Sequence, residues 1–139
     1  MNTDKKMMNT DTANRKEEDY RYKELTGLIL KSAFEIHNTL GCGFLEKVYE
    51  RALIYELKMN KLKLATQKAM TILYKDQDLG SYVADIVVED KVIVELKNVN
   101  FLAMIHKAQV LNYLKASGYN VALILNFSKP RLEYQRVVR

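Results

Sequence analysis

The sequence has only one cysteine, Cys42, which excludes a disulfide within the chain and any zinc site built from several cysteines. A reducing compartment fits this composition. No hydrophobic run approaches the roughly 18 to 20 residues that span a bilayer, and the N-terminus lacks the apolar core of a secretory signal. We therefore expect a cytoplasmic protein with no membrane partner.

Proline is also scarce, with a single residue, and no internal repeat is visible in the 139 residues. Apolar residues make up 48% of the chain, which is enough for the core of one domain of this length. Residues 1–24 differ, because they are poor in aliphatic side chains and mix both signs of charge. We predict a flexible polar tail over 1–24 and one folded domain over 25–139.

The formal net charge is +5. Because the charges of residues 1–24 balance, the excess positive charge belongs to the folded domain. A positive balance favours an anionic partner such as nucleic acid through long-range attraction, although many soluble domains carry as much charge. Net charge alone does not decide the function.

Hydrophobic periodicity predicts the order of the elements. Residues 25–40 carry a helical apolar stripe that stops at the glycines of "GCG", and a second stripe runs to about residue 60. Three strand segments follow, then a helix over 101–117 capped by Asn100 and ended by Gly118, and then two more strands. A helical crossover normally joins parallel strands. We predict a mixed α/β (α+β) fold, with helices on both faces of a mixed central sheet.

The segment "ADIVVEDKVIVELK" reads as a hairpin that places charged residues among aliphatic ones. Side chains alternate along a strand, so Glu95 and Lys97 share a face. If the turn takes an odd number of residues, Asp85 falls opposite Glu95. The three charges then lie together.

Two carboxylates at the roughly 5 Å separation of a cross-strand pair repel each other unless a cation lies between them or one proton is retained. Mg²⁺ or Mn²⁺ suits such oxygen ligands, and either ion can activate water beside a phosphate. Lys97 can orient or deprotonate that water, or stabilise the pentavalent phosphate. The alternative is a solvent-facing patch whose surface salt bridge contributes little.

Two further segments carry candidate site residues. Glu46 lies in the first turn of the second helix and is a candidate third carboxylate for the metal, with Tyr49 one turn on. Their ordinary alternatives are a glutamate that favours the positive end of the helix and a tyrosine of the core. On the third helix, one narrow arc contains Leu102, His106, Gln109 and Tyr113, beside an apolar arc of Phe101, Met104, Ala108 and Leu111.

Gln109 and Tyr113 are candidates for binding phosphate or water near the site. Tyr49 and His106 are added as candidate substrate contacts. These side chains can instead satisfy buried polar groups, and a histidine in such a position is more often structural than catalytic.

Taken together, these motifs resemble the GxxExxY proteins, a branch of the PD-(D/E)XK nuclease superfamily. The name corresponds here to Gly43, Glu46 and Tyr49, and the similarity runs from about Leu25 to Val138. It includes the segments "LGCGFLEKVYERAL", "YVADIVVEDKVIVELK", "HKAQVLNYLKASG" and "LILNF". The resemblance implies a restriction-endonuclease-like core.

The resemblance also implies roles for single residues. The positions of Asp85 and Glu95 hold a divalent metal, Lys97 completes the ExK element, and Glu46 matches the glutamate of the preceding helix. Gln109 and Tyr113 match a Q-x-x-x-Y element that helps to position the substrate backbone. Ala84 departs from the pattern, because it stands where the superfamily name has proline.

We therefore expect a Mg²⁺- or Mn²⁺-dependent nuclease acting on nucleic acid, with DNA as the first choice. A noncatalytic module that binds nucleic acid or protein through the same fold is the alternative. A homodimer formed through exposed parts of the sheet is left open by the sequence.

Overall fold

The computed structural model describes residues 3–139, with side chains described from residue 22 onward. The elements follow the predicted order, and their bounds are α1 (Thr3–Leu40), α2 (Glu46–Met59), β1 (Leu64–Tyr74), β2 (Gln77–Val88), β3 (Val92–Lys97), α3 (Met104–Ser117), β4 (Val121–Asn126) and β5 (Glu133–Val138).

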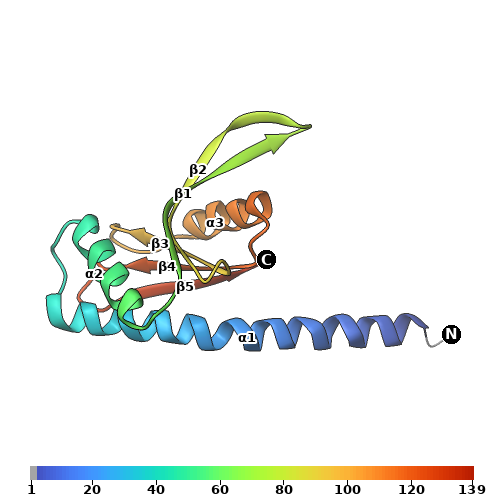
Figure 1. Cartoon of the computed structure of the whole chain (residues 1–139), viewed down its shortest axis with the longest axis horizontal. Coiled ribbons are helices and arrows are strands. Elements are labelled where there is room, and N and C mark those ends of the chain that lie inside the picture. The colour runs from blue at the N-terminus through green and yellow to red at the C-terminus, as the bar shows by residue number, and fades with distance from the viewer. Residues whose placement is uncertain (1–2) are drawn as a thin grey trace.

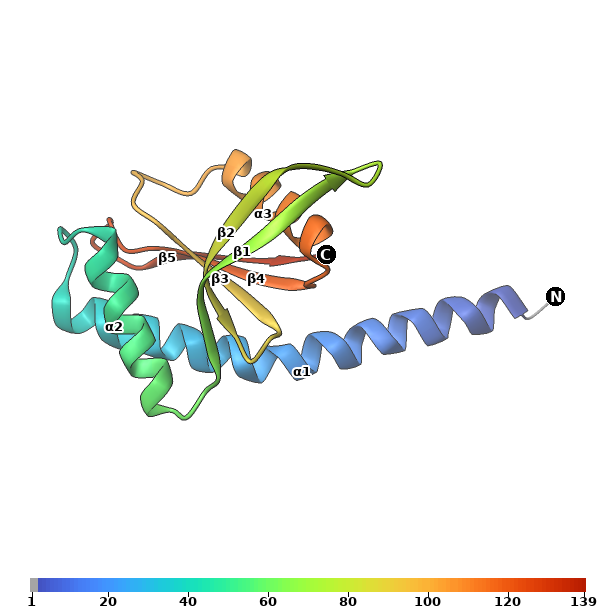
Figure 2. The ribbon, with the colours of Figure 1, turned by 45° about the horizontal axis from the view of Figure 1, so that its top comes forward.

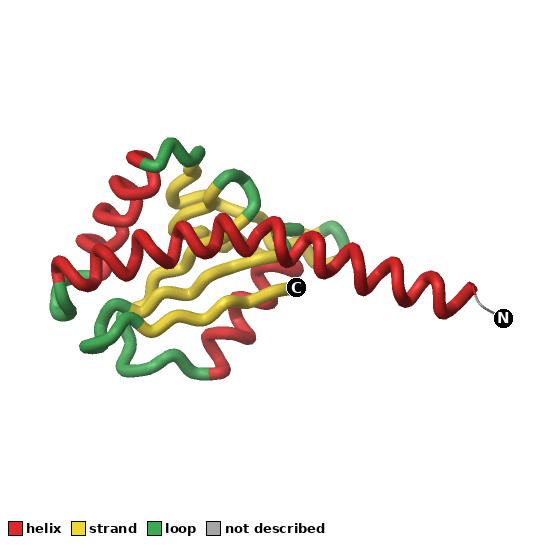
Figure 3. The backbone as a smooth tube through the Cα atoms, turned by 90° about the horizontal axis from the view of Figure 1, so that it is seen from below, coloured by secondary structure: helices red, strands yellow, loops and turns green. Residues whose placement is uncertain are grey.

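The five strands form one sheet in chain order, β1-β2-β3-β4-β5. The β3–β4 pair, which α3 connects, is parallel, and the other three pairs are antiparallel. Helices α1 and α2 pack on one face and α3 on the other (Figures 1 and 3). The predicted mixed sheet with helices on both faces is therefore confirmed, and so is the α+β, restriction-endonuclease-like class.

Helix α1 begins at Thr3, far upstream of the apolar stripe that starts at Leu25. Lysine, arginine and glutamate favour helices as single residues, so a polar segment can continue a helix that packing has already started. Its N-terminal part extends beyond the sheet (Figure 1). The flexibility of residues 1–24 stays a prediction, and residues 1 and 2 lie outside the described residues. Within the described part of the chain, no helix is long and apolar enough to span a membrane.

Helix α3 begins at Met104, with Ala103 as the residue before it, so the predicted start at residue 101 and the Asn100 cap were wrong. Its buried residues are Val110 and Leu114, whereas Met104 is 88% exposed. The apolar arc predicted for this helix therefore faces mostly outward, with Phe101, Met104 and Ala108 exposed and Leu111 half-buried. A helix with apolar residues on nearly every side does not reveal its buried face by periodicity alone. The predicted C-cap is confirmed, since Gly118 has the left-handed φ of 84°.

The corner between α1 and α2 is held by Tyr49, which is buried. Its hydroxyl donates to the carbonyl oxygen of Gly41 (2.5 Å) and accepts from the N–H of Phe44 (3.3 Å). Its ring stacks on Phe127 with centroids 4.6 Å apart. Gly43 has a φ of 111°, which side-chain-bearing residues rarely adopt. The corner fixes where α2 begins.

Replacing Tyr49 by phenylalanine is expected to lower the free energy of unfolding by about 1–2 kcal/mol, because the Gly41 carbonyl and the Phe44 N–H lose their partner while the ring stays packed. Urea unfolding checks this value. Tyr55→Phe is the matched control, since that tyrosine is 65% exposed on the same helix. A large loss of nucleic-acid cleavage at unchanged stability would instead support the predicted substrate contact of Tyr49.

Candidate metal-binding site

The site lies where β2 separates from β3. Strand β2 pairs with β1 along nearly its whole length, but with β3 only over Ile86–Val88. Val88 pairs with Val92, so the turn has the predicted odd length, and Asp85 is next in register to face Glu95. The Asp85 carboxylate replaces a backbone partner there, because its Oδ2 accepts from the N–H of Leu96 at 2.9 Å. The fork therefore brings an aspartate side chain directly against β3.

Glu95 is only 6% exposed, which is unusual for a carboxylate. Its Oε1 accepts a hydrogen bond from the hydroxyl of Tyr82, which is itself buried. The Tyr82 ring stacks on Tyr113 of α3, with centroids 3.5 Å apart and planes 9° apart. Burial raises the pKa of Glu95 to about 7, the Tyr82 hydrogen bond opposes this rise, and the charge of Asp85 adds to it. Burial and the charge of Glu95 also raise the pKa of Tyr82.

Helix α2 supplies two more carboxylates beside the fork. Glu50, one turn after Glu46, is 6% exposed, and its Oε2 lies 3.8 Å from the Nζ of Lys47. Burial and then the charge of Asp85 raise the pKa of Glu46. Burial also raises the pKa of Asp85; the Leu96 hydrogen bond opposes this, and the charge of Glu50 adds to it. Glu46 and Glu50 of α2 and Asp85 of β2 thus repel one another.

Lys97, the last residue of β3, lies beside this cluster of carboxylates. Its positive charge lowers the pKa of Glu46, of Asp85 and of Glu95, which places it near all three carboxylates. It is half-buried at the end of β3, in register with Asn126 of β4. The predicted juxtaposition of acid and lysine is therefore present in the structure.

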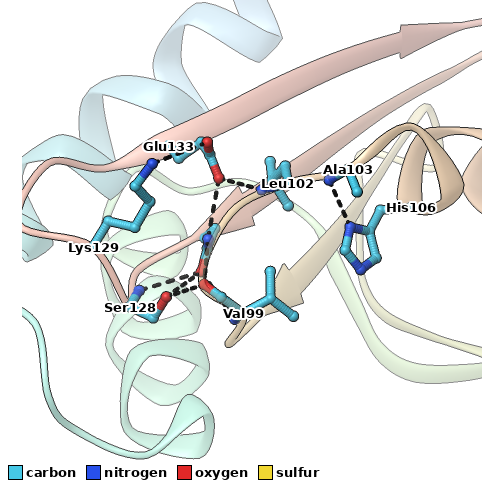
Figure 4. A network of polar contacts seen from close by, with 8 residues as sticks. Val99, Leu102, Ala103, His106, Ser128, Lys129 and Glu133 are labelled. Atoms are coloured by element: carbon cyan, nitrogen blue, oxygen red, sulfur yellow. Dashed lines mark hydrogen bonds and ion pairs between the residues drawn. The ribbon is translucent and has the colours of Figure 1, made fainter.

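A buried polar network fixes the segment between Lys97 and α3. Asn126 is completely buried, and its Nδ2 donates to the carbonyl oxygen of Val99 (2.8 Å) and to Oε1 of Glu133 (3.2 Å). The same Glu133 oxygen accepts from the N–H of Leu102 at 2.5 Å (Figure 4). These hydrogen bonds tie Val99 to β4 and Leu102 to β5. They thereby fix the direction in which the chain leaves the sheet after Lys97.

The candidate substrate residues lie in different surroundings. His106 accepts from the N–H of Ala103 through Nδ1 at 2.9 Å, at the start of α3 (Figure 4). Gln109 is exposed on the same helix, and Tyr113 is half-buried against Tyr82. Tyr49 is engaged at the glycine corner. Their contacts with substrate stay predictions, and Tyr113 is the one that the Tyr82 stack links to a site carboxylate.

The comparison with protein families matches the model of the PD-(D/E)XK nuclease superfamily over residues 23–137. The chain belongs to this superfamily. A search of solved structures finds similarity to the crystal structure of SSO0001, with 18% identity and a TM-score of 0.52. The match covers 91% of this chain and 62% of SSO0001, and at this identity it supports the fold alone. No curated protein matches the sequence.

The sequence motifs of the PD-(D/E)XK superfamily account for Asp85, Glu95 and Lys97 but not for the side chains that contact them. Tyr82, Glu50 and Gln67 were not predicted as site residues. Glu50 had a visible signal, because it lies four residues after Glu46 and therefore on the same helical face. Tyr82 and Gln67 had none, because strand alternation predicts neither the contact of Tyr82 with Glu95 nor that of Gln67 with Glu50 of α2.

The donor chemistry of the site fits the divalent ion typical of PD-(D/E)XK nucleases. The cluster offers hard carboxylate oxygens, which Mg²⁺ and Mn²⁺ prefer. Burial, and then repulsion by a neighbouring carboxylate, raises the pKa of each of Glu46, Asp85 and Glu95, and a bound cation would relieve both effects. Among the residues that the structure describes, no three His, Cys, Asp or Glu side chains form a ready-made ligand group. Direct binding by all three carboxylates therefore stays a prediction, with Asp85 and Glu95 as the central pair.

Proposed function

We propose that the protein is a Mg²⁺- or Mn²⁺-dependent nuclease that hydrolyses phosphodiester bonds, with DNA as substrate. The observation that carries this proposal is the fork between β2 and β3, where Asp85, Glu95 and Lys97 meet the acidic residues of α2. A protein that only binds a polyanion gains nothing from clustered carboxylates facing phosphate.

The residues of the site have distinct roles in this proposal. Asp85 and Glu95 hold the ion, and Glu46 contacts it through water or directly. Tyr82 orients Glu95 through the hydrogen bond to Oε1. The bound ion supplies positive charge for the phosphate and makes water more acidic. Lys97 places its amino group beside the attacked phosphate, where the ammonium form would stabilise the added negative charge, or the neutral amine would accept a proton from the attacking water.

Lys97→Ala is expected to lower metal-dependent DNA cleavage about 100-fold, which is the usual size of one acid–base or electrostatic contribution. The assay measures the first-order cleavage rate of labelled single- and double-stranded DNA, and of RNA, with Mg²⁺, Mn²⁺ or chelator. Lys115→Ala, an exposed lysine of α3, is the matched control. Cleavage that persists in chelator, or equal rates for wild type and Lys97→Ala, would count against the proposal.

A further inference from the structure

In each strand of the β1–β2 hairpin, the alternation of side chains between the two faces of the sheet is reversed at one position. In β2, Ala84 packs in the core on the α3 side, whereas Ile86 packs in the core on the α1 and α2 side. Residues two apart in a regular strand share a face, so β2 reverses at Asp85. In β1, Leu64 packs toward α1 and α2 but Met70 toward α3. The hairpin is therefore pivoted where the acidic site lies, and beyond this point it projects as an arm (Figure 2).

Gln67 is the residue of β1 at this pivot. The neighbouring pairs Thr66↔Ile86 and Lys68↔Ala84 place it opposite Asp85. Its φ is 48°, in the left-handed region that a residue with a side chain rarely adopts within a strand. Such a conformation costs on the order of 1 kcal/mol and persists where the surroundings require it. The strain thus lies directly across the ladder from the aspartate of the site.

The Gln67 side chain lies beside two of the carboxylates. Its Nε2 donates to Oε1 of Glu50 at 2.7 Å, which joins β1 to α2. The same amide also lowers the pKa of Asp85, the residue directly across the ladder, so it lies beside that carboxylate as well. A primary amide carries two N–H groups, so one Nε2 can serve both acceptors without adding charge. An ammonium at this position would instead compete with a metal ion for the two carboxylates.

We propose that Gln67 is a positioning residue of the metal site, whose strained backbone aims a neutral amide between Glu50 and Asp85 and so holds Asp85 ready for the ion. This inference rests on the proposed function for the identity of the ion and the reaction. The effect of Gln67 on the position of Asp85 needs no ion, so it can be tested separately in the metal-free protein.

The experiment compares two variants that lose the amide but differ in backbone strain. Gln67→Gly adopts the left-handed φ without strain, and Gln67→Met keeps the length of the side chain and the strain. Lys75→Gly is the control, since Lys75 has a similar φ of 47° at the distant β1–β2 turn. The measurements on the whole chain are the midpoint of thermal unfolding, the dissociation constant of Mn²⁺ by calorimetry, and amide hydrogen exchange at Leu96, whose N–H donates to Asp85.

We expect both Gln67 variants to bind Mn²⁺ about tenfold more weakly, the loss that a missing support of a metal ligand usually causes. Exchange at Leu96 should become about tenfold faster, because Asp85 no longer stays on that N–H. The unfolding midpoint of Gln67→Gly should stay within about 3 °C of the wild type, so that a general loss of structure does not explain the effect. Lys75→Gly should change neither Mn²⁺ affinity nor Leu96 exchange.

Unchanged exchange at Leu96 in both Gln67 variants would overturn the positioning role, whether or not the protein cleaves DNA. A loss of affinity in Gln67→Gly that only follows a lowered unfolding midpoint would overturn it as well. If the wild-type protein neither binds Mn²⁺ nor cleaves nucleic acid, the proposed function fails. Faster exchange at Leu96 in the variants would then still support Gln67 as the residue that holds Asp85.

Discussion

Glu95→Gln is expected to lower the rate of metal-dependent DNA cleavage by at least about 1000-fold while the protein remains folded. The substitution removes one of the two central negative charges that would hold the ion, and a bound ion contributes several kcal/mol to phosphate hydrolysis. The fold should tolerate the change, because glutamine has the same shape and its amide oxygen can still accept from the hydroxyl of Tyr82. The cleavage rate at saturating Mg²⁺, together with calorimetric Mn²⁺ binding, measures the effect.

The matched control is Glu35→Gln, the same chemical change at an exposed position of α1. It should leave cleavage and Mn²⁺ binding unchanged. A Glu95→Gln protein that cleaves at the wild-type rate would show that Glu95 does not hold the ion. DNA affinity in chelator separates the alternative of a noncatalytic binding module, which predicts a DNA affinity unaffected by this substitution and no cleavage by the wild type.

The predicted juxtaposition of Asp85 and Glu95 depended on one local rule. Alternation of apolar and polar residues in the hairpin, together with an odd turn, was enough to put both carboxylates at one place, and the register of Val88 with Val92 confirms that step. The order of helices and strands could be predicted for the same reason. Each helical stripe or strand pattern depends only on residues close together in the sequence, which repeat with the period of a helix or a strand.

The supporting contacts could not be predicted from such local patterns. Alternation in "SYVADIVV" assigns Tyr82, Ala84 and Ile86 to one face, but the chain reverses at Asp85, and no residue there signals the pivot. The left-handed backbone occurs at Gln67. The sequence does not predict it there, because glycine and asparagine are the residues that usually adopt this conformation. The Glu50 and Tyr82 contacts need the three-dimensional arrangement of α2 and β2 first.

The buried carboxylates of the candidate site are expected to lower the stability of the metal-free protein. Buried carboxylates are stabilised by pairing or by hydrogen bonds, and Glu95 retains a strongly raised pKa despite the Tyr82 hydroxyl. Strain at Gln67 adds to that cost. Such a loss of stability is expected where a site binds a ligand of opposite charge. The free energy of unfolding should therefore report whether the carboxylates are ionised and whether a cation is bound.

Stability of the metal-free protein is accordingly expected to fall as the pH rises from about 5 to 8, and Glu95→Gln should remove a large part of this fall. The pKa of Glu95 is raised from 4.5 to about 7 in the folded protein. Between these values the folded state binds more protons than the unfolded state, so stability is fully present below the lower value and is lost as pH passes through the upper one. The raised pKa values of Asp85 and Glu46 act in the same direction.

The difference in unfolding free energy between Glu95→Gln and wild type should therefore be near zero at pH 4.5 and reach on the order of 3 kcal/mol in favour of the variant at pH 8. Thermal unfolding in chelator at both pH values measures it. Saturating Mg²⁺ at pH 8 should raise the stability of the wild type and much less that of the variant, because the ion offsets the repulsion that the variant no longer has. An offset that stays the same at both pH values would show that the Glu95 carboxyl is already ionised at low pH, and the cluster would then lack the electrostatic reason to bind a cation.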